Sequence, residues 1–204
     1  MPISTAQLMT TIGLAVEGQT AWGVAPPSTN PGVYMISLSG HDDRNEAARP
    51  AAPVCKQAVA HWLARVPKLE LDGKTGPPAS ELVACLQGFW LPDESILYIG
   101  KATSLAHRLN QFFRHKLGNR SPHAGGHWIK TLACLDTLHV HYCTCGSVAE
   151  AEAAETRALD AFAGQVSSTS RAALVGVKVP IPFANRVCPT HGRKQTRLRR
   201  DVRR

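Results

Sequence analysis

The chain lacks any hydrophobic run that approaches the roughly 20 apolar residues a membrane-spanning helix requires. Its first residues also lack the basic and then apolar segments of a secretory signal. With 44% hydrophobic and 19% charged residues, the composition excludes collagen-like, coiled-coil and wholly disordered proteins. We therefore expect a globular, cytoplasmic protein without membrane association. Its six cysteines are expected to be reduced thiols rather than disulfides.

Acidic residues are missing from residues 98–130, which hold six lysines and arginines and a net charge of +6. Residues 186–204 add eight basic residues against Asp201, a net charge of +7, although the whole chain carries only +8. Because neutralised phosphates release their counterions, charge concentrated in this way favours a polyanionic partner such as DNA. For residues 186–204, the alternative is a disordered end that improves solubility and binds no partner.

Hydrophobic periodicity divides the chain into a few elements. Alternating or β-branched runs predict strands, and apolar residues at helical spacing predict the helices between them. This order predicts an α/β (α+β) fold with one large insertion. The expected strands cover residues 32–38, 95–100 and 138–145, with a further one open at 172–179, and the expected helices cover residues 4–16, 54–66, 80–86, 103–117 and 148–163.

Four side chains in these elements suit phosphodiester hydrolysis. Tyr34 and Tyr98 lie in the first two expected strands, Arg108 lies on the helix that follows, and Glu155 lies on an acidic helix. A carboxylate can hold a hard divalent cation, and a phenol can position or deprotonate water. An arginine can neutralise the charge of a phosphorane-like transition state. Taken singly, each residue also fits a structural role, as a core aromatic or a solvated helix residue.

Five ordered sequence elements resemble the motifs of the GIY-YIG nuclease family. Together they extend over residues 32–185, so most of the chain takes part in the resemblance. The elements are Gly32-Val-Tyr34, Tyr98-Ile-Gly100, the run from Tyr98 to Arg108 (similar to YIG-K-x-x-x-L-x-x-R), the glutamate helix with Glu150, Glu152 and Glu155 before Ala158-Leu159, and Pro182-Phe-Ala-Asn185.

The resemblance implies an endonuclease with one Mg²⁺ or Mn²⁺ ion, and a central three-stranded, mainly antiparallel sheet flanked by helices. Carried across by position, Glu155 would be the metal ligand, and Arg108 would stabilise the scissile phosphate. Tyr34 would be the general base or the phenol that positions water, and Tyr98 would border the same pocket.

The resemblance also implies residues that support this site. Lys101 would hold water or phosphate, and Asn185 would brace the site or bind substrate. Arg114 and Lys116, in the same basic segment, are expected to bind the DNA backbone.

Two features depart from the family pattern. Phe112 stands four residues after the arginine, where the family usually has histidine or tyrosine, and it can transfer no proton. His115, three residues further, is expected on nearly the same helical face and could substitute. The second departure is the 63 residues between Tyr34 and Tyr98. They predict a mostly helical inserted subdomain at residues 39–94.

The predicted organisation is an N-terminal extension (1–30), a nuclease domain (31–187) that contains the 39–94 insertion, and a basic C-terminal tail (188–204). Because residues 1–97 are net acidic, we expect the insertion to serve regulation, homodimerisation or a partner protein rather than DNA contact.

A structural zinc site is a further hypothesis, because imidazole and thiolate ligands suit zinc. His139, His141, Cys143 and Cys145 would share one face of a strand, and Cys188 and His191 follow in the tail. Neither set has paired zinc-finger spacing, and buried thiols on a core strand are the alternative.

We therefore predict a divalent-metal-dependent DNA endonuclease of the restriction or mobile-element type. Two alternatives stay open: a catalytically weakened nucleic-acid-binding module that keeps the fold, and an accessory subunit that needs a partner protein.

Overall fold

A four-stranded antiparallel sheet, in the order β1-β6-β2-β5, lies at the centre of the structure. The structure is a computed structural model that describes residues 2–119, 126–174 and 179–200. The α+β class predicted from the sequence is confirmed, but the sheet has a fourth strand. Its members are β1 (Gly18–Ala21), β2 (Gly32–Ser37), β5 (Ile96–Ala102) and β6 (His139–Thr144).

Strand β1 comes from the segment that the sequence assigned to an N-terminal extension. It pairs with β6, so that Gly18 lies opposite Tyr142 and Ala21 opposite His139. A Cβ atom at position 18 would come within 2.4 Å of the Tyr142 hydroxyl, so any other residue here would force the Tyr142 side chain to shift. The extension is therefore part of the sheet.

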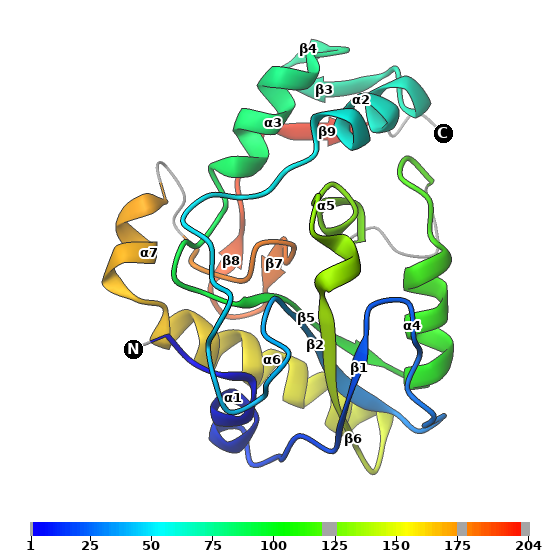
Figure 1. Cartoon of the computed structure of the whole chain (residues 1–204), viewed down its shortest axis with the longest axis vertical. Helices are drawn as coiled ribbons and strands as arrows, with labels where there is room; N and C mark the ends of the chain where they lie inside the picture. Colours follow the sequence, from blue (N-terminus) through cyan, green and yellow to red (C-terminus); the bar gives the residue numbers. More distant parts are fainter. Residues whose placement is uncertain (1, 120–125, 175–178, 201–204) are drawn as a thin grey trace.

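Helices cover both faces of the sheet (Figure 1). Helices α1 (Thr5–Thr11) and α6 (Val148–Gln165) pack on the face to which Val33 and Met35 point. Helix α4 (Leu105–Arg114) packs on the opposite face, to which Tyr34 and Ile36 point. Side chains along β2 point alternately to the two faces, and every position is buried, as expected for a strand that is covered on both faces of the sheet.

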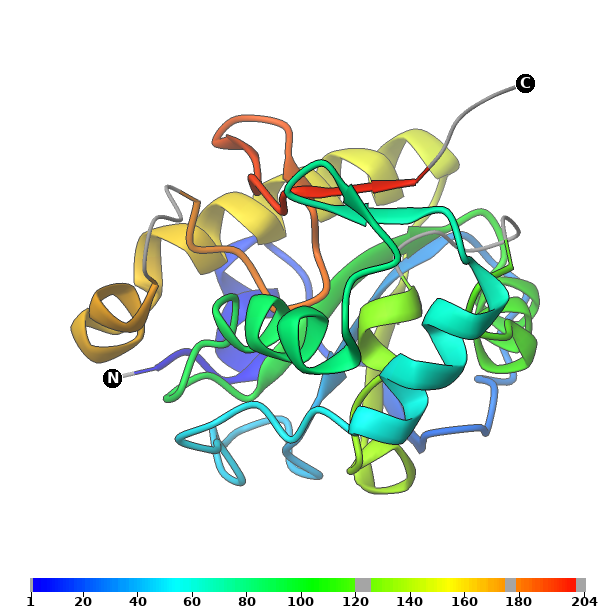
Figure 2. The ribbon, with the colours of Figure 1, turned by 90° about the horizontal axis from the view of Figure 1, so that it is seen from above.

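The insertion forms a unit with the C-terminal segment. It contains α2 (Lys56–Arg65), β3 (Leu69–Leu71), β4 (Lys74–Thr75) and α3 (Ala79–Gln87). Strand β9 (Leu198–Arg200) pairs antiparallel with β3 and completes a three-stranded sheet in the order β4-β3-β9. Figure 2 shows β9 beside this part of the insertion. The insertion is thus not purely helical, and the described part of the tail is docked on it.

The C-terminal segment also contains a short hairpin of β7 (Val187–Cys188) and β8 (Gly192–Arg193). Helix α7 (Ser168–Ala173) covers the start of the possible strand at 172–179. Residues 175–178 of that range lie outside the described residues. The remaining elements are α5 (Gly126–Ile129) and a 3₁₀ helix (Leu135–Thr137). Among the described residues, no helix has the length and apolar character needed to cross a membrane. All six cysteines carry free thiols.

Candidate active site at the edge of strand β5

Tyr34 and Tyr98 pack against each other between β2 and β5, with ring centroids 5.9 Å apart. Tyr34 lies directly opposite Gly100. A Cβ atom at position 100 would come within 2.8 Å of the Tyr34 hydroxyl and 2.6 Å of the Tyr98 ring. Contacts this short do not occur, so glycine at this position makes room for both phenols.

Gly32, the first residue of the other motif, is required for a similar reason. A Cβ atom there would lie 2.3 Å from the Cys143 carbonyl oxygen and 2.8 Å from the Leu105 side chain. Strand β2 can therefore approach both β6 and the start of α4 only if this residue has no side chain. Both motif glycines have a steric explanation in the packing around the tyrosine pair.

Arg108 connects the two phenols to the rest of the site. The Tyr34 hydroxyl donates to the Tyr98 oxygen and accepts a hydrogen bond from the Arg108 guanidinium. Burial, reinforced by Tyr98, raises the pKa of Tyr34 well above its ordinary value, against the effect of Arg108. Burial and then the Glu155 charge raise the pKa of Tyr98 to about 12. Both phenols are therefore protonated at neutral pH.

Glu155 lies in the middle of α6 and is half-buried. Ser147 caps this helix by accepting the backbone N–H of Glu150, and the alanine-rich sequence favours the helical conformation. The Glu155 carboxylate accepts the backbone N–H of Lys101. Burial raises the pKa of this carboxyl above its ordinary value, although Lys101 and Arg108 oppose the shift. The Lys101 ammonium forms an ion pair with Glu152.

Asn185 closes the outer edge of β5. Its Oδ1 accepts the backbone N–H of Ile99 at 2.9 Å, and its Nδ2 donates to the Ile99 carbonyl at 2.8 Å. The neighbouring Ala184 N–H donates to the Leu97 carbonyl at 2.8 Å. The Asn185 side chain thus makes the hydrogen bonds that a neighbouring strand would make. Together with Ala184 it fixes the backbone on both sides of Tyr98. Both polar atoms of this amide are engaged in holding the strand.

A cavity of about 400 Å³ lies along this edge. Tyr98, Glu155 and Asn185 line it together with Arg186 and Arg193. Arg186 directly precedes β7 and Arg193 lies in β8, and burial, with the adjacent Arg193 charge, lowers the pKa of Arg186. Within the described part of the chain, neither guanidinium forms an ion pair with a carboxylate. Two neighbouring cations opposite a carboxylate can hold a phosphate next to a divalent cation.

The sequence interpretation missed Arg186 and Arg193 as members of this site. It counted both only in the net charge of residues 186–204. Arg186 could have been found, because it directly follows Asn185 in the sequence. Arg193 could not, because only the turn of the hairpin brings it back to the cavity.

Phe112 lies beside the tyrosine pair. Its ring meets Tyr98 edge-on, with centroids 5.7 Å apart, and it also packs on Trp22. Helix α4 ends at Arg114, so that His115 is its C-cap residue, and His115 is not among the residues that line the Glu155 cavity. The buried His115 ring meets the His127 ring edge-on, at a centroid distance of 4.7 Å. The substitution of Phe112 by His115 in proton transfer stays a prediction.

Arg114 and Lys116 lie away from the residues that line the Glu155 cavity. Arg114 is exposed in the last turn of α4. Lys116 lines a separate cavity of about 490 Å³ between α2 and the end of α4, together with Arg65 and Lys130. The structure thus divides the expected site residues between two places, with Tyr98, Glu155 and Asn185 lining the first.

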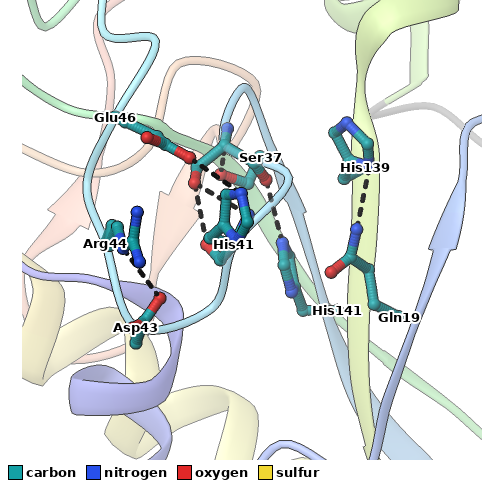
Figure 3. A network of polar contacts seen from close by, with 9 residues as sticks. Gln19, Ser37, His41, Asp43, Arg44, Glu46, His139 and His141 are labelled. Atoms are coloured by element: carbon teal, nitrogen blue, oxygen red, sulfur yellow. Dashed lines mark hydrogen bonds and ion pairs between the residues drawn. The ribbon is translucent and has the colours of Figure 1, made fainter.

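The histidines of β6 are held by hydrogen bonds (Figure 3). His139 Nδ1 accepts from the Gln19 amide at 3.0 Å, and His141 Nε2 lies 3.0 Å from the Ser39 carbonyl oxygen. Within residues 2–119, 126–174 and 179–200, one group of three or more metal-ligating side chains comes together, formed by Asp160, Cys188 and His191. The described residues therefore do not support a zinc site on β6. Cys188 and His191 lie together with Asp160, which is a third possible ligand.

Comparisons of the chain with protein-family models, with curated proteins and with solved structures found no match in any of the three. The function is therefore inferred from the site itself and from the sequence motifs.

Proposed function

We propose that this chain is a metal-dependent endonuclease that hydrolyses phosphodiester bonds in DNA, with the cavity at the β5 edge as its active site. The observation that carries the proposal is the meeting of Glu155, Tyr98 and two guanidiniums in one cavity. Glu155 and Tyr98 belong to sequence elements that resemble the GIY-YIG nucleases, and the two guanidiniums belong to Arg186, just before the β7–β8 hairpin, and to Arg193 of β8. The proposed class is a restriction-type or mobile-element nuclease.

The residues at the cavity fit a hard divalent cation. Glu155 is a half-buried carboxylate facing a space that can contain several water molecules, and Mg²⁺ typically binds one or two carboxylates and keeps its waters. Glu155 is the residue that would hold Mg²⁺ or Mn²⁺. When bound, such a cation polarises a phosphoryl oxygen and makes a bound water more acidic.

Three arginines bind the phosphate and stabilise the charge that develops on it. Arg186 and Arg193 bind the phosphate, since they offer adjacent guanidiniums to its oxygens. Arg108, oriented by its hydrogen bond to Tyr34, stabilises the negative charge that develops during hydrolysis.

The phenols act by position rather than by removing a proton. Tyr98 lines the cavity, and because its pKa is raised to about 12, it orients water or donates a hydrogen bond at neutral pH. Tyr34 is fully buried behind it and holds Tyr98 and Arg108 in place. This assignment replaces the general-base role first considered for Tyr34.

The test is cleavage of supercoiled plasmid in Mg²⁺ or Mn²⁺, with EDTA as the metal-free control. Glu155→Gln should reduce the rate at least about 100-fold, because the amide cannot hold the cation. Glu150→Gln is the matched control on the same helix. Its side chain accepts the Gly146 N–H at 2.7 Å, a contact that glutamine can keep. Equal cleavage by wild type and Glu155→Gln would refute the proposal.

Phe112 favours a second candidate, a nucleic-acid-binding module with weakened catalysis. An apolar ring contacts Tyr98 where the related motif has a group that can transfer a proton. Retained DNA affinity with no cleavage in either metal would favour this candidate. Phe112→His would then be expected to raise the cleavage rate.

A further inference from the structure

Three different donor atoms meet between α6 and the β7–β8 hairpin. They belong to Asp160, Cys188 and His191, and all lie within 4.8 Å of one another. The Cys188 Sγ atom is 3.3 Å from Asp160 Oδ1, and His191 Nε2 is 3.6 Å from the same oxygen. This cluster shares no residue with the cavity of the proposed active site.

The two separations from Asp160 Oδ1 are close to those of neighbouring ligands around one tetrahedral ion. Bond lengths of about 2.3 Å to sulfur and about 2.0 Å to nitrogen or oxygen place neighbouring ligand atoms about 3.3–3.6 Å apart around zinc. The Thr190 hydroxyl hydrogen-bonds to the Asp160 carboxylate and so orients it, as hydrogen bonds commonly do for metal ligands. From this geometry we propose that Asp160, Cys188 and His191 bind a Zn²⁺ ion, with water as the fourth ligand.

The chemistry of the ligands favours zinc over the hard cation proposed for Glu155. A thiolate and an imidazole are typical zinc ligands, whereas Mg²⁺ prefers oxygen alone. Cys188 is fully buried, and a thiolate there is stabilised by the ion and by neutralisation of its charge. The net charge of Zn²⁺ with one thiolate and one carboxylate is zero.

The position of the ion gives it a structural consequence. Strands β7 and β8 contain two residues each, and so short a hairpin has little stability of its own. Zinc would fasten it to α6, on which Asp160 lies five residues after Glu155. The ion would thereby fix Arg186 and Arg193 relative to Glu155, with which they line the cavity.

The experiment is metal analysis of untagged protein expressed in zinc-supplemented medium. Wild type should contain about one zinc per chain, and Cys188→Ser and His191→Ala should each contain less than about 0.2. Cys145→Ser, which changes a half-buried cysteine elsewhere, should keep the zinc. Glu155→Gln should keep it too, which separates this site from the proposed active site. His191 is exposed, so its variant should fold even if Cys188→Ser does not.

Two further measurements complete the test. Cobalt in place of zinc should give a thiolate charge-transfer absorption in wild type that is absent from a folded Cys188→Ser protein. A chelator should lower the melting temperature of wild type by about 5 °C and leave that of His191→Ala unchanged. Wild-type protein with less than about 0.1 zinc per chain, or variants with the same zinc content as wild type, would overturn the proposal. None of these readouts depends on nuclease activity.

Discussion

Residues 98–130 and residues 186–204 carry net charges of +6 and +7, and the fold uses these charges differently. In the first segment, Arg108 hydrogen-bonds to Tyr34 and Lys101 contacts Glu155 through its backbone, whereas Lys116 and Lys130 line a separate cavity. In the second, Arg186 and Arg193 line the cavity, but the residues that follow are built into the sheet shared with the insertion. Net charge along a sequence therefore does not show how much charge is available to a ligand.

Lys194 is a basic residue whose side chain is not available to a ligand. Its side chain is buried, and its Nζ donates to the carbonyl oxygens of Pro182 at 2.7 Å and Phe183 at 2.9 Å. The ammonium also lies over the rings of Phe89 and Trp128. A few residues on, Arg197 forms an ion pair with Asp72 of the insertion at 3.0 Å. Both side chains are therefore engaged by groups of the fold.

The largest expected effect separates two arginines of the same helix. Arg108→Met should reduce cleavage at least about 100-fold, because it removes the charge next to the phenols and Glu155. Arg114→Met should change the rate less than about threefold, because that side chain is exposed at the end of α4. Single-turnover rates on one plasmid substrate measure both. Similar losses in the two variants would mean that charge on α4, and not its position, matters.

A smaller effect is expected on stability in the second segment. Lys194→Met should lower the free energy of unfolding by about 2–4 kcal/mol, because two buried carbonyl groups lose their donor. Lys74→Met, on the exposed strand β4, should change it by less than about 0.5 kcal/mol. Urea denaturation followed by circular dichroism gives both values. A Lys194→Met protein as stable as wild type would contradict the structural role of this lysine.

The smallest expected effect concerns pH. Glu155 must be ionised to hold a cation, and burial raises its pKa above the ordinary 4.5. Cleavage should therefore begin to fall at a higher pH than an exposed carboxyl would give, by about tenfold per pH unit below the raised pKa. Because Mg²⁺ competes with the proton, a higher Mg²⁺ concentration should move this acid limb to lower pH. An acid limb independent of Mg²⁺ would assign it to another group.

The sequence predicted the elements whose hydrophobic pattern lies within the element itself. The β-branched runs around Tyr34 and Tyr98 are strands, and the apolar spacing around Arg108 and the alanine-rich run around Glu155 are helices. Because these elements carry the motifs, the sequence also named three of the residues that line the cavity.

What the sequence did not predict depends on contacts between distant segments. Strand β1 has no apolar alternation of its own, and its pairing with β6 defines it. Strand β9 forms only against β3, some 130 residues earlier. Helix α4 was expected to continue to residue 117 but ends at Arg114, because no glycine or proline directly marks its end before Gly118.

The most direct measurement compares two charge-matched double variants of the C-terminal segment. Arg186→Gln/Arg193→Gln removes the guanidiniums that line the cavity, and Arg197→Gln/Arg199→Gln removes the same charge from β9 and the residue before it. With both proteins shown to be folded, the first should cleave plasmid at least about 100-fold more slowly than wild type. The second should stay within about threefold of wild type. Equal loss of cleavage in the two would contradict the cavity at the β5 edge as the active site.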